Sequence, residues 1–402
     1  MMRRPFRWLL VWLVTAGMTV AVLVPPALAS HYAKTVLARL TDGERQELAS
    51  YEAVRDFFDQ QTDKYWAVAV SKRKARQVKK RSGGTLTLDD YVLQQPPVYA
   101  GPELSRKLSA KLAKLVRALD PKAEPAKPKV LPGVPEMLSA AEQEYGFIPE
   151  QVRESEFRRQ FVREALAAGL SKGQVVRVYA LETSGNGTYG LISGLNSRTG
   201  AGKPISSAIG YVQLLHANSV DTLAQHGRVL VTRLSARAKD PAVPPERRRA
   251  LVDKIVILKH MMREAKAVGG SWQEHYDFGG SRKGLGIHAL NLDIDAGPWL
   301  QVVKLNDLRR LAEKKGFGKV TGAQLEIMNL AGPASGMEML TPLTRDVPTA
   351  NFFERGGYER NGVVRGRTAG QLLAEMDERI DSWMDQPGVR ELTALFDELA
   401  QQ

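Results

Sequence analysis

A glutamate near the end of a helix is the residue whose type and position most clearly indicate chemistry. Ser171 and Gln174 fit the Ser-x-x-Gln pattern of a capping box, which predicts that a helix begins there. Positions i, i+3, i+4 and i+7 of that helix are Val175, Val178, Tyr179 and Glu182. Glu182 should therefore lie on the apolar face, directly before Thr183-Ser184-Gly185, where we expect the helix to end.

A carboxyl group in that position should have a raised pKa. Burial favours its neutral form, and the partial negative charge at the C-terminus of a helix does so too. A raised pKa is what a general acid needs in order to work near neutral pH. The alternative is a glutamate that reaches water at the helix edge, or that pairs with one of the many arginines.

Three further segments with polar side chains follow along the chain. They are Ser206-Ser207-Ala208-Ile209-Gly210-Tyr211-Val212-Gln213-Leu214-Leu215, then Asn291-Leu292 with Ala296-Gly297-Pro298-Trp299-Leu300, and Met328-Asn329-Leu330-Ala331-Gly332-Pro333. With Leu181-Glu182-Thr183-Ser184-Gly185, they resemble the lytic transglycosylase family with a lysozyme-like catalytic domain. In that family a Glu-Ser pair ends a helix, and Gly-x-x-Gln, Asn-aliphatic with Ala-Gly-x-x-Leu, and Tyr-Asn-Ala-Gly follow in this order. The resemblance covers residues 139–345.

The sequence departs from the family pattern at several positions. Thr183 stands where the family usually has serine, and Met328 replaces the usual tyrosine. Leu330 separates Asn329 from the Ala-Gly pair, and the gaps on both sides of Gln213 are longer than usual. Glu182 is the position that matches the family most directly. Tyr276 and Tyr358 are the candidates to replace the missing tyrosine.

The resemblance implies a peptidoglycan lytic transglycosylase, a lyase that needs one carboxyl group and no cofactor or metal. Glu182 would protonate the β-1,4 glycosidic oxygen between N-acetylmuramic acid and N-acetylglucosamine. It would then take the proton of the muramic acid 6-hydroxyl, which attacks to leave a 1,6-anhydro end. The implied substrate-binding residues are Ser184, Tyr211, Gln213 and Asn329. Gln213 and Asn329 would supply neutral hydrogen bonds, while the Tyr211 ring would either stack on a sugar or belong to the core.

Two other functions are compatible with the same residues. The first is a non-catalytic scaffold protein of the cell envelope that binds peptidoglycan. The second is a lysozyme-type hydrolase, which is favoured if Asp293 or Asp295 reaches the cleft.

Other catalytic patterns find less support. Gly185 to Gly190 matches the glycine pattern of dinucleotide-binding proteins, but the next acidic residue, Asp221, is too far along the chain. The six histidines include no His-Glu-x-x-His pattern, so no metal site is predicted.

The N-terminus has the three parts of an export signal. Arg3, Arg4 and Arg7 form a basic region, Trp8 to Val24 is an uncharged apolar run, and Ala27-Leu28-Ala29 is a cleavage pattern. We therefore expect residues 1–29 to be a signal peptide of a secreted, periplasmic protein. If the signal is not cleaved, this run would instead anchor the protein in the membrane.

The composition limits the classes of partner. The chain of 402 residues has 57 Lys and Arg against 44 Asp and Glu, a formal charge of +13, and no cysteine, which excludes disulfides and thiol catalysis. In an exported protein this charge favours peptidoglycan glycan strands over nucleic acid. The densest basic segment, Lys72 to Arg81, is either a solvated helix face or a site that attaches to an anionic envelope surface.

The remaining pattern predicts a mainly α protein. The resemblance implies that it has a lysozyme-like helical catalytic domain, with extra helical regions at both ends. Residues 30–120 form the N-terminal helical region, and the proline-rich segment 121–135 is a linker. The catalytic domain spans residues 136–345, with a basic helical insertion at about 220–285. Residues 346–402 form a C-terminal region of two helices that separate at Pro387-Gly388.

Overall fold

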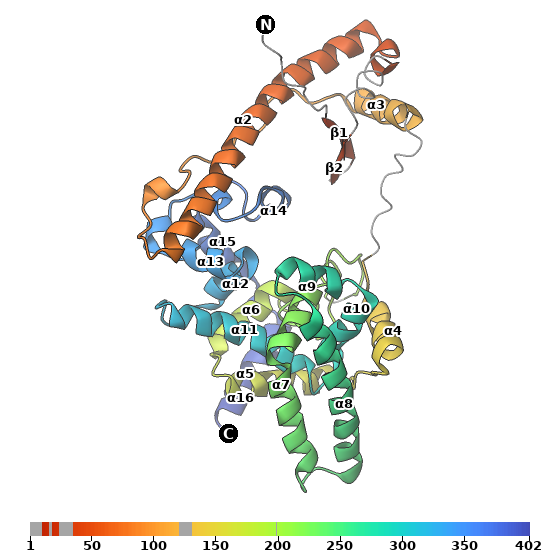
Figure 1. Cartoon of the computed structure of the whole chain (residues 1–402), viewed down its shortest axis with the longest axis vertical. Coiled ribbons are helices and arrows are strands. Elements are labelled where there is room, and N and C mark those ends of the chain that lie inside the picture. Colours follow the sequence, from red (N-terminus) through yellow and green to blue (C-terminus); the bar gives the residue numbers. More distant parts are fainter. Residues whose placement is uncertain (1–9, 16–17, 24–34, 120–130, 198) are drawn as a thin grey trace. The chain divides into compact units, whose positions relative to one another are not determined.

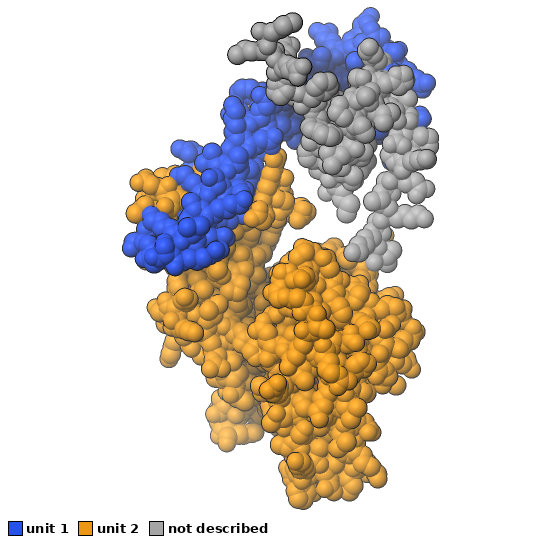
Figure 2. Space-filling model, viewed as in Figure 1, with its two compact units in different colours: residues 1–85, 94–130 blue, residues 86–93, 131–402 orange. Residues whose placement is uncertain are grey.

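The computed structural model describes residues 10–15, 18–23, 35–119, 131–197 and 199–402. The described chain is mainly helical, as the sequence predicts, and is compatible with an all-α fold. It forms two compact units: residues 1–85 with 94–130, and residues 86–93 with 131–402 (Figure 2). No described helix is both long enough and apolar enough to cross a membrane.

Much of the predicted signal peptide and linker lies outside the described residues. Within residues 1–29, the structure describes two short strands, β1 (Leu10–Thr15) and β2 (Met18–Leu23), which pair in antiparallel register from Leu10 with Leu23 to Thr15 with Met18. Of the predicted linker, it describes residues 131–135. Pro135 does not continue an extended segment there, because it lies in the first turn of the next helix, where the missing N–H costs nothing.

The first unit contains two long helices, α2 (Asp42–Arg81) and α3 (Arg106–Leu119). Thr41 and Glu44 cap the start of α2 reciprocally, and a left-handed Gly83 lies just beyond its end. Leucines at helical spacing form the core of this unit: Leu40, Leu48 and Leu108, with Leu104, Leu112 and Leu115 packed against them. Both helices agree with the apolar periodicity of residues 30–120.

The second unit contains all the predicted site residues. Its helices up to residue 288 are α4 (Val134–Tyr145), α5 (Glu154–Ala167), α6 (Lys172–Thr183), α7 (His216–Lys239), α8 (Pro245–Ala267), α9 (Trp272–Gly279) and α10 (Arg282–His288). The later helices are α11 (Gly297–Lys314), α12 (Gly322–Ala331), α13 (Pro333–Met339), α14 (Arg355–Arg360), α15 (Ala369–Trp383) and α16 (Pro387–Ala400). Four short 3₁₀ turns complete the set: Leu88–Asp90, Ala289–Leu292, Pro342–Thr344 and Thr349–Asn351.

Helix α6 is central to this unit because it packs against α12, α15 and α16. Its apolar face, with Val175, Val178 and Tyr179, is fully buried. The starts of α6 and α12 are joined, since Gln174 Nε2 donates to the carbonyl of Val320 at 2.8 Å. Gly322 permits this close approach, because a Cβ there would lie 2.6 Å from the Cβ of Arg177. The C-terminal ends of α6 and α12 also lie close to each other.

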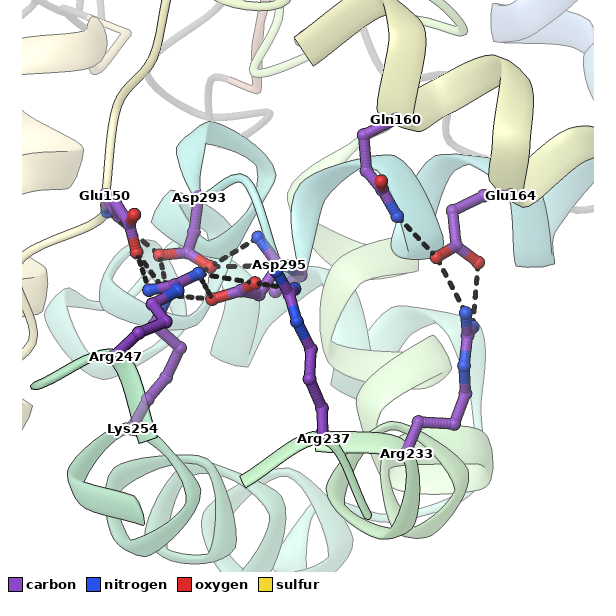
Figure 3. Close-up of polar contacts among 10 residues, drawn as sticks. Glu150, Gln160, Glu164, Arg233, Arg237, Arg247, Lys254, Asp293 and Asp295 are labelled. Carbon is purple, nitrogen blue, oxygen red and sulfur yellow. Dashed lines mark hydrogen bonds and ion pairs between the residues drawn. The ribbon is translucent and has the colours of Figure 1, made fainter. Parts of the chain in front are cut away.

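The predicted insertion forms mainly a helical hairpin of α7 and α8 (Figure 1). A buried ion-pair cluster holds it to the core: Lys254 Nζ lies 2.8 Å from Asp293 and 2.5 Å from Asp295 (Figure 3). Arg237 and Arg247 pair with Asp295 at 2.9 Å and 2.7 Å. The basic residues of the hairpin thus neutralise acidic groups of the core.

The C-terminal region belongs to the same unit. Helices α15 and α16 pack on α6, and α16 also packs on α5. Residues 86–93, which the sequence places in the N-terminal region, join this unit as well. The amide of Asn351 exchanges two 2.8 Å hydrogen bonds with the backbone of Val92, and Tyr91 packs against Phe352.

Candidate active site

A groove opens at the C-terminal end of α6 and has a volume of about 490 Å³. It is lined by Glu182 and Thr183 in the last turn of α6, by Ser184 and Asn186 just after it, by residues 191–197, by Gln213 and by Trp383 of α15. Most of these groups are polar and uncharged, and Glu182 is the sole ionisable residue among the described residues of the lining.

The local sequence places Glu182 at this groove. The capping box of Ser171 and Gln174 forms as predicted, and α6 ends at Thr183, where Ser184 adopts a left-handed backbone with φ 50°. Thr183 Oγ1 donates to the carbonyl of Tyr179 at 2.7 Å, so this hydroxyl is held back against the preceding turn of the helix. The chain then turns away and leaves the Glu182 side chain facing the groove.

The carboxyl group of Glu182 favours its neutral form. Burial raises its pKa, while hydrogen bonds from Glu326 and Asn329 oppose this effect only in part. Asn329 Nδ2 donates to Glu182 Oε1 at 3.3 Å. Glu182 as a whole residue is partly exposed and lines the groove, so a ligand in the groove can contact a carboxyl group with a raised pKa.

A second carboxyl group, which the sequence analysis missed, lies against the first. Glu326 on α12 is buried and hydrogen-bonds to Glu182, and two carboxyl groups can do so only if one is protonated. Glu326 Oε1 has no hydrogen-bond partner among the described residues, so Oε2 is the oxygen that carries the proton and donates it to Glu182. Burial, with Glu182 next to it, raises the pKa of Glu326 well above its ordinary value.

A lysine side chain interacts with one member of this pair. Lys304 of α11 interacts electrostatically with Glu326, and it lines a small cavity of about 140 Å³ together with Asp221, His226 and Asp307. Burial lowers the pKa of Lys304, although these acidic neighbours favour its charged form. Of the two carboxyl groups, Glu182 therefore lines the groove and Glu326 interacts with the lysine.

The predicted binding residue Gln213 lines the groove but uses part of its amide to hold the loop. Its Nε2 donates to the carbonyls of Leu191 at 3.0 Å and Gly210 at 2.9 Å. Both partners are acceptors, so the nitrogen must face them and the amide oxygen is the group left for a ligand. The left-handed backbone at Gln213, with φ 43°, accompanies this turn.

The other predicted binding residues have different surroundings. Ser184 is exposed and lines the groove. Asn329 lies beside Glu182 but outside the groove lining, and its amide nitrogen binds the carboxyl group instead of a sugar.

Tyr211 is a core residue. Its side chain is 0% exposed, packs edge-on against Phe157, Phe161 and Tyr179, and hydrogen-bonds to Glu154. No face of its ring is open to a sugar, because the three surrounding rings and the core cover it.

The C-terminal helices supply a wall that the sequence analysis did not assign. Trp383 lines the groove from the end of α15. Asn186 fixes this junction, since its Nδ2 donates to Gln386 Oε1 at 2.8 Å and its Oδ1 accepts from the amide of Gly388 at 3.3 Å. A Cβ at Gly388 would lie 2.4 Å from the Tyr179 hydroxyl, so glycine is needed for this contact.

A sequence signal for Glu326 exists. It is the one charged residue in the apolar stretch from Leu325 to Met328, three positions before Asn329, and a lone carboxyl on an apolar face is also what singles out Glu182. Trp383 has no comparable signal, because its place depends on how distant helices pack.

The remaining candidates lie elsewhere. Asp293 and Asp295 are buried in the ion-pair cluster and do not line the groove. The Tyr358 hydroxyl accepts from the amide of Gly366 at 2.8 Å, and Tyr276 lies on α9, outside the groove lining. Gly185 to Gly190 follows a helix and not the strand that dinucleotide binding requires. Among the described residues, no group of His, Asp and Glu side chains is arranged to hold a metal ion.

Comparison with known proteins does not identify a family for this chain. The chain matches no protein-family model, no curated protein and no solved structure. The function of the chain is therefore inferred from the geometry of the groove and from the motifs of the sequence.

Proposed function

We propose that this protein is a peptidoglycan lytic transglycosylase with a lysozyme-like catalytic domain, in which Glu182 is the single general acid and base. Its substrate is the β-1,4 bond between N-acetylmuramic acid and N-acetylglucosamine, and its product is a 1,6-anhydromuramic acid end. The observation that carries this proposal is that the Glu182 carboxyl, with a pKa raised by burial, is the sole ionisable group that the described residues contribute to the groove lining.

The two carboxyl groups are too close together for a two-carboxylate hydrolase. Such enzymes place their carboxyl groups on either side of the sugar, about 5 Å apart or more. Glu182 and Glu326 are instead hydrogen-bonded to each other, so no sugar fits between them. Asp293 and Asp295, the other candidates for a second acid, are bound to lysine and arginine. One working carboxyl favours an intramolecular nucleophile, the 6-hydroxyl, over an activated water.

The surroundings of Glu182 suit both halves of this reaction. As an acid, Glu182 donates its proton to the glycosidic oxygen, and burial favours the protonated form that this step needs. As a carboxylate it keeps hydrogen bonds from Glu326 and Asn329, which stabilise the charge until the 6-hydroxyl gives up its proton. The amide oxygen of Gln213 and the hydroxyl of Ser184 are available to hold sugar substituents, and Trp383 offers an aromatic wall.

Digestion of purified peptidoglycan by the mature chain tests the proposal. Mass spectrometry should find 1,6-anhydro ends, and Glu182→Gln should lower their rate of formation by about 10²- to 10⁴-fold. Glu142→Gln, at an exposed glutamate of α4, is the matched control and should leave the rate unchanged.

Each rival function predicts a different result. Reducing ends in place of anhydro ends would support a lysozyme-type hydrolase. Binding without cleavage, and without any effect of Glu182→Gln, would support a non-catalytic scaffold.

A further inference from the structure

Two aromatic side chains are stacked on the surface of α9. The rings of Trp272 and Tyr276 lie one turn apart, with centroids 5.0 Å apart and planes inclined by 26°. Trp272 is 56% exposed and Tyr276 is 36% exposed. Water meets apolar ring surface here, although folding usually buries rings of this size. The proposed chemistry uses neither residue.

Helix α9 is held firmly in place. Ser271 and Glu274 form a capping box at its start. At its end Gly279 contacts His216, where an added Cβ would lie 2.3 Å from the imidazole ring. His216 Nε2 also lies 2.9 Å from the carbonyl oxygen of Tyr276, and the two rings are 4.6 Å apart. The stacked pair is therefore a rigid surface, which costs little entropy to use in binding.

The same histidine connects this surface to the groove. His216 follows the groove-lining Gln213 by three residues, which is at most about 11 Å of extended chain. His216 thus contacts Tyr276 of the stacked pair and lies close along the chain to the Gln213 end of the groove.

We propose that Trp272 and Tyr276 form a stacking platform that binds a further sugar of the same glycan strand, beyond the groove. The inference rests on the proposed function. A hexose ring presents an apolar C–H face of a size that suits an exposed aromatic ring, and neutral stacking tolerates the different substituents along the strand. A glycan strand is the occupant that the groove itself implies, because a polymer cut inside the groove must leave it on both sides.

The test compares a long and a short ligand in the full chain. With Glu182→Gln as the background, binding to purified peptidoglycan sacculi is measured by pelleting, and binding to a peptidoglycan tetrasaccharide by calorimetry. Trp272→Ala should weaken binding to sacculi by about 3- to 10-fold, with a smaller loss for the tetrasaccharide. Trp272→Phe keeps a ring and should recover most of the affinity.

The control is Phe57→Ala, which removes an equally exposed ring from the first unit and should leave both affinities unchanged. If Trp272→Ala binds sacculi as tightly as Phe57→Ala does, or loses both ligands equally, the platform is refuted. Failure of the proposed function is a separate result, because it would appear as an absence of cleavage with Trp272 in place.

Discussion

Two pairs of acidic side chains in the larger unit lie in opposite surroundings. Asp293 and Asp295 are in contact with Lys254, and Asp295 also with Arg237 and Arg247 (Figure 3). Glu182 and Glu326 contact each other and the neutral Asn329, while Lys304 interacts electrostatically with Glu326 but forms no ion pair with it in the described structure. The first pair joins the α7–α8 hairpin to the core, and Glu182 of the second pair lines the groove.

The pKa of Asp295 differs accordingly from those of the two glutamates. Burial opposes ionisation of Asp295, but its three cations outweigh this and lower its pKa. Asp293 pairs with Lys254, and burial still raises its pKa. No comparable charge compensates for burial at Glu182 and Glu326, so both pKa values are raised. Residues of the same chemical type thus become a structural anchor or a proton donor according to whether cations surround them.

The largest expected effect comes from removing the cation of the structural pair. Lys254→Met leaves Asp293 and Asp295 buried without their shared partner, which should cost about 3–5 kcal/mol of unfolding free energy in urea at neutral pH. The lowered pKa of Asp295 adds stability above its ordinary pKa, and this is lost as pH falls through the lower folded value. The deficit of the variant should therefore shrink in acid.

The matched control is Lys259→Met, at an exposed lysine of the same helix. Equal stability of the two variants would show that the cluster does not anchor the hairpin.

A second prediction concerns the hydrogen bond between the two glutamates. Glu326→Leu removes a donor to the Glu182 carboxylate, so the pKa of Glu182 should rise further. Since the acid step needs protonated Glu182, the alkaline limb of kcat/KM should move up by about one to two pH units. Glu326→Gln keeps a donor and should hold the limb near its original place. A downward shift in the leucine variant would mean that Glu326 is ionised in the native protein.

A smaller effect is expected on stability. The raised pKa of Glu326 means that the folded state loses stability as pH rises from the ordinary carboxyl pKa through the folded one. Glu326→Gln removes this penalty, so the melting temperature should increase by about 2–4 °C at neutral pH and not in acid. Calorimetric scans at both pH values measure it, and a gain that is larger in acid would contradict the assignment.

The smallest effect is expected at the wall of the groove. Trp383→Ala should raise KM for peptidoglycan by about 3- to 10-fold, with a lesser change in kcat, because stacking binds substrate and transition state alike. Trp383→Phe should restore most of the affinity. A loss confined to kcat would place Trp383 in the chemistry and not in binding.

Local patterns along the chain predicted the elements well. The capping box at Ser171, the end of α6 at Thr183 and the break at Pro387 all depend on neighbouring residues, and the structure has each of them. The apolar spacing that turns Glu182 inward is likewise a local property of one helix.

Features that depend on contacts between distant segments could not be predicted from the sequence in the same way. Trp383 reaches the groove because α15 packs on α6, some two hundred residues away along the chain. Tyr211 turns into the core because Glu154 accepts its hydroxyl there, which nothing in the loop sequence indicates. Glu326 was visible as a lone carboxyl in an apolar helix, but only the joined starts of α6 and α12 bring it to Glu182.

Digestion of peptidoglycan in water enriched in heavy oxygen tests the central claim most directly. If Glu182 activates the 6-hydroxyl of the muramic acid, the new ends should be 1,6-anhydro ends that contain no heavy oxygen, and they should be lost in Glu182→Gln. Heavy oxygen at the anomeric carbon of every new end would show that water is the nucleophile and would contradict the account.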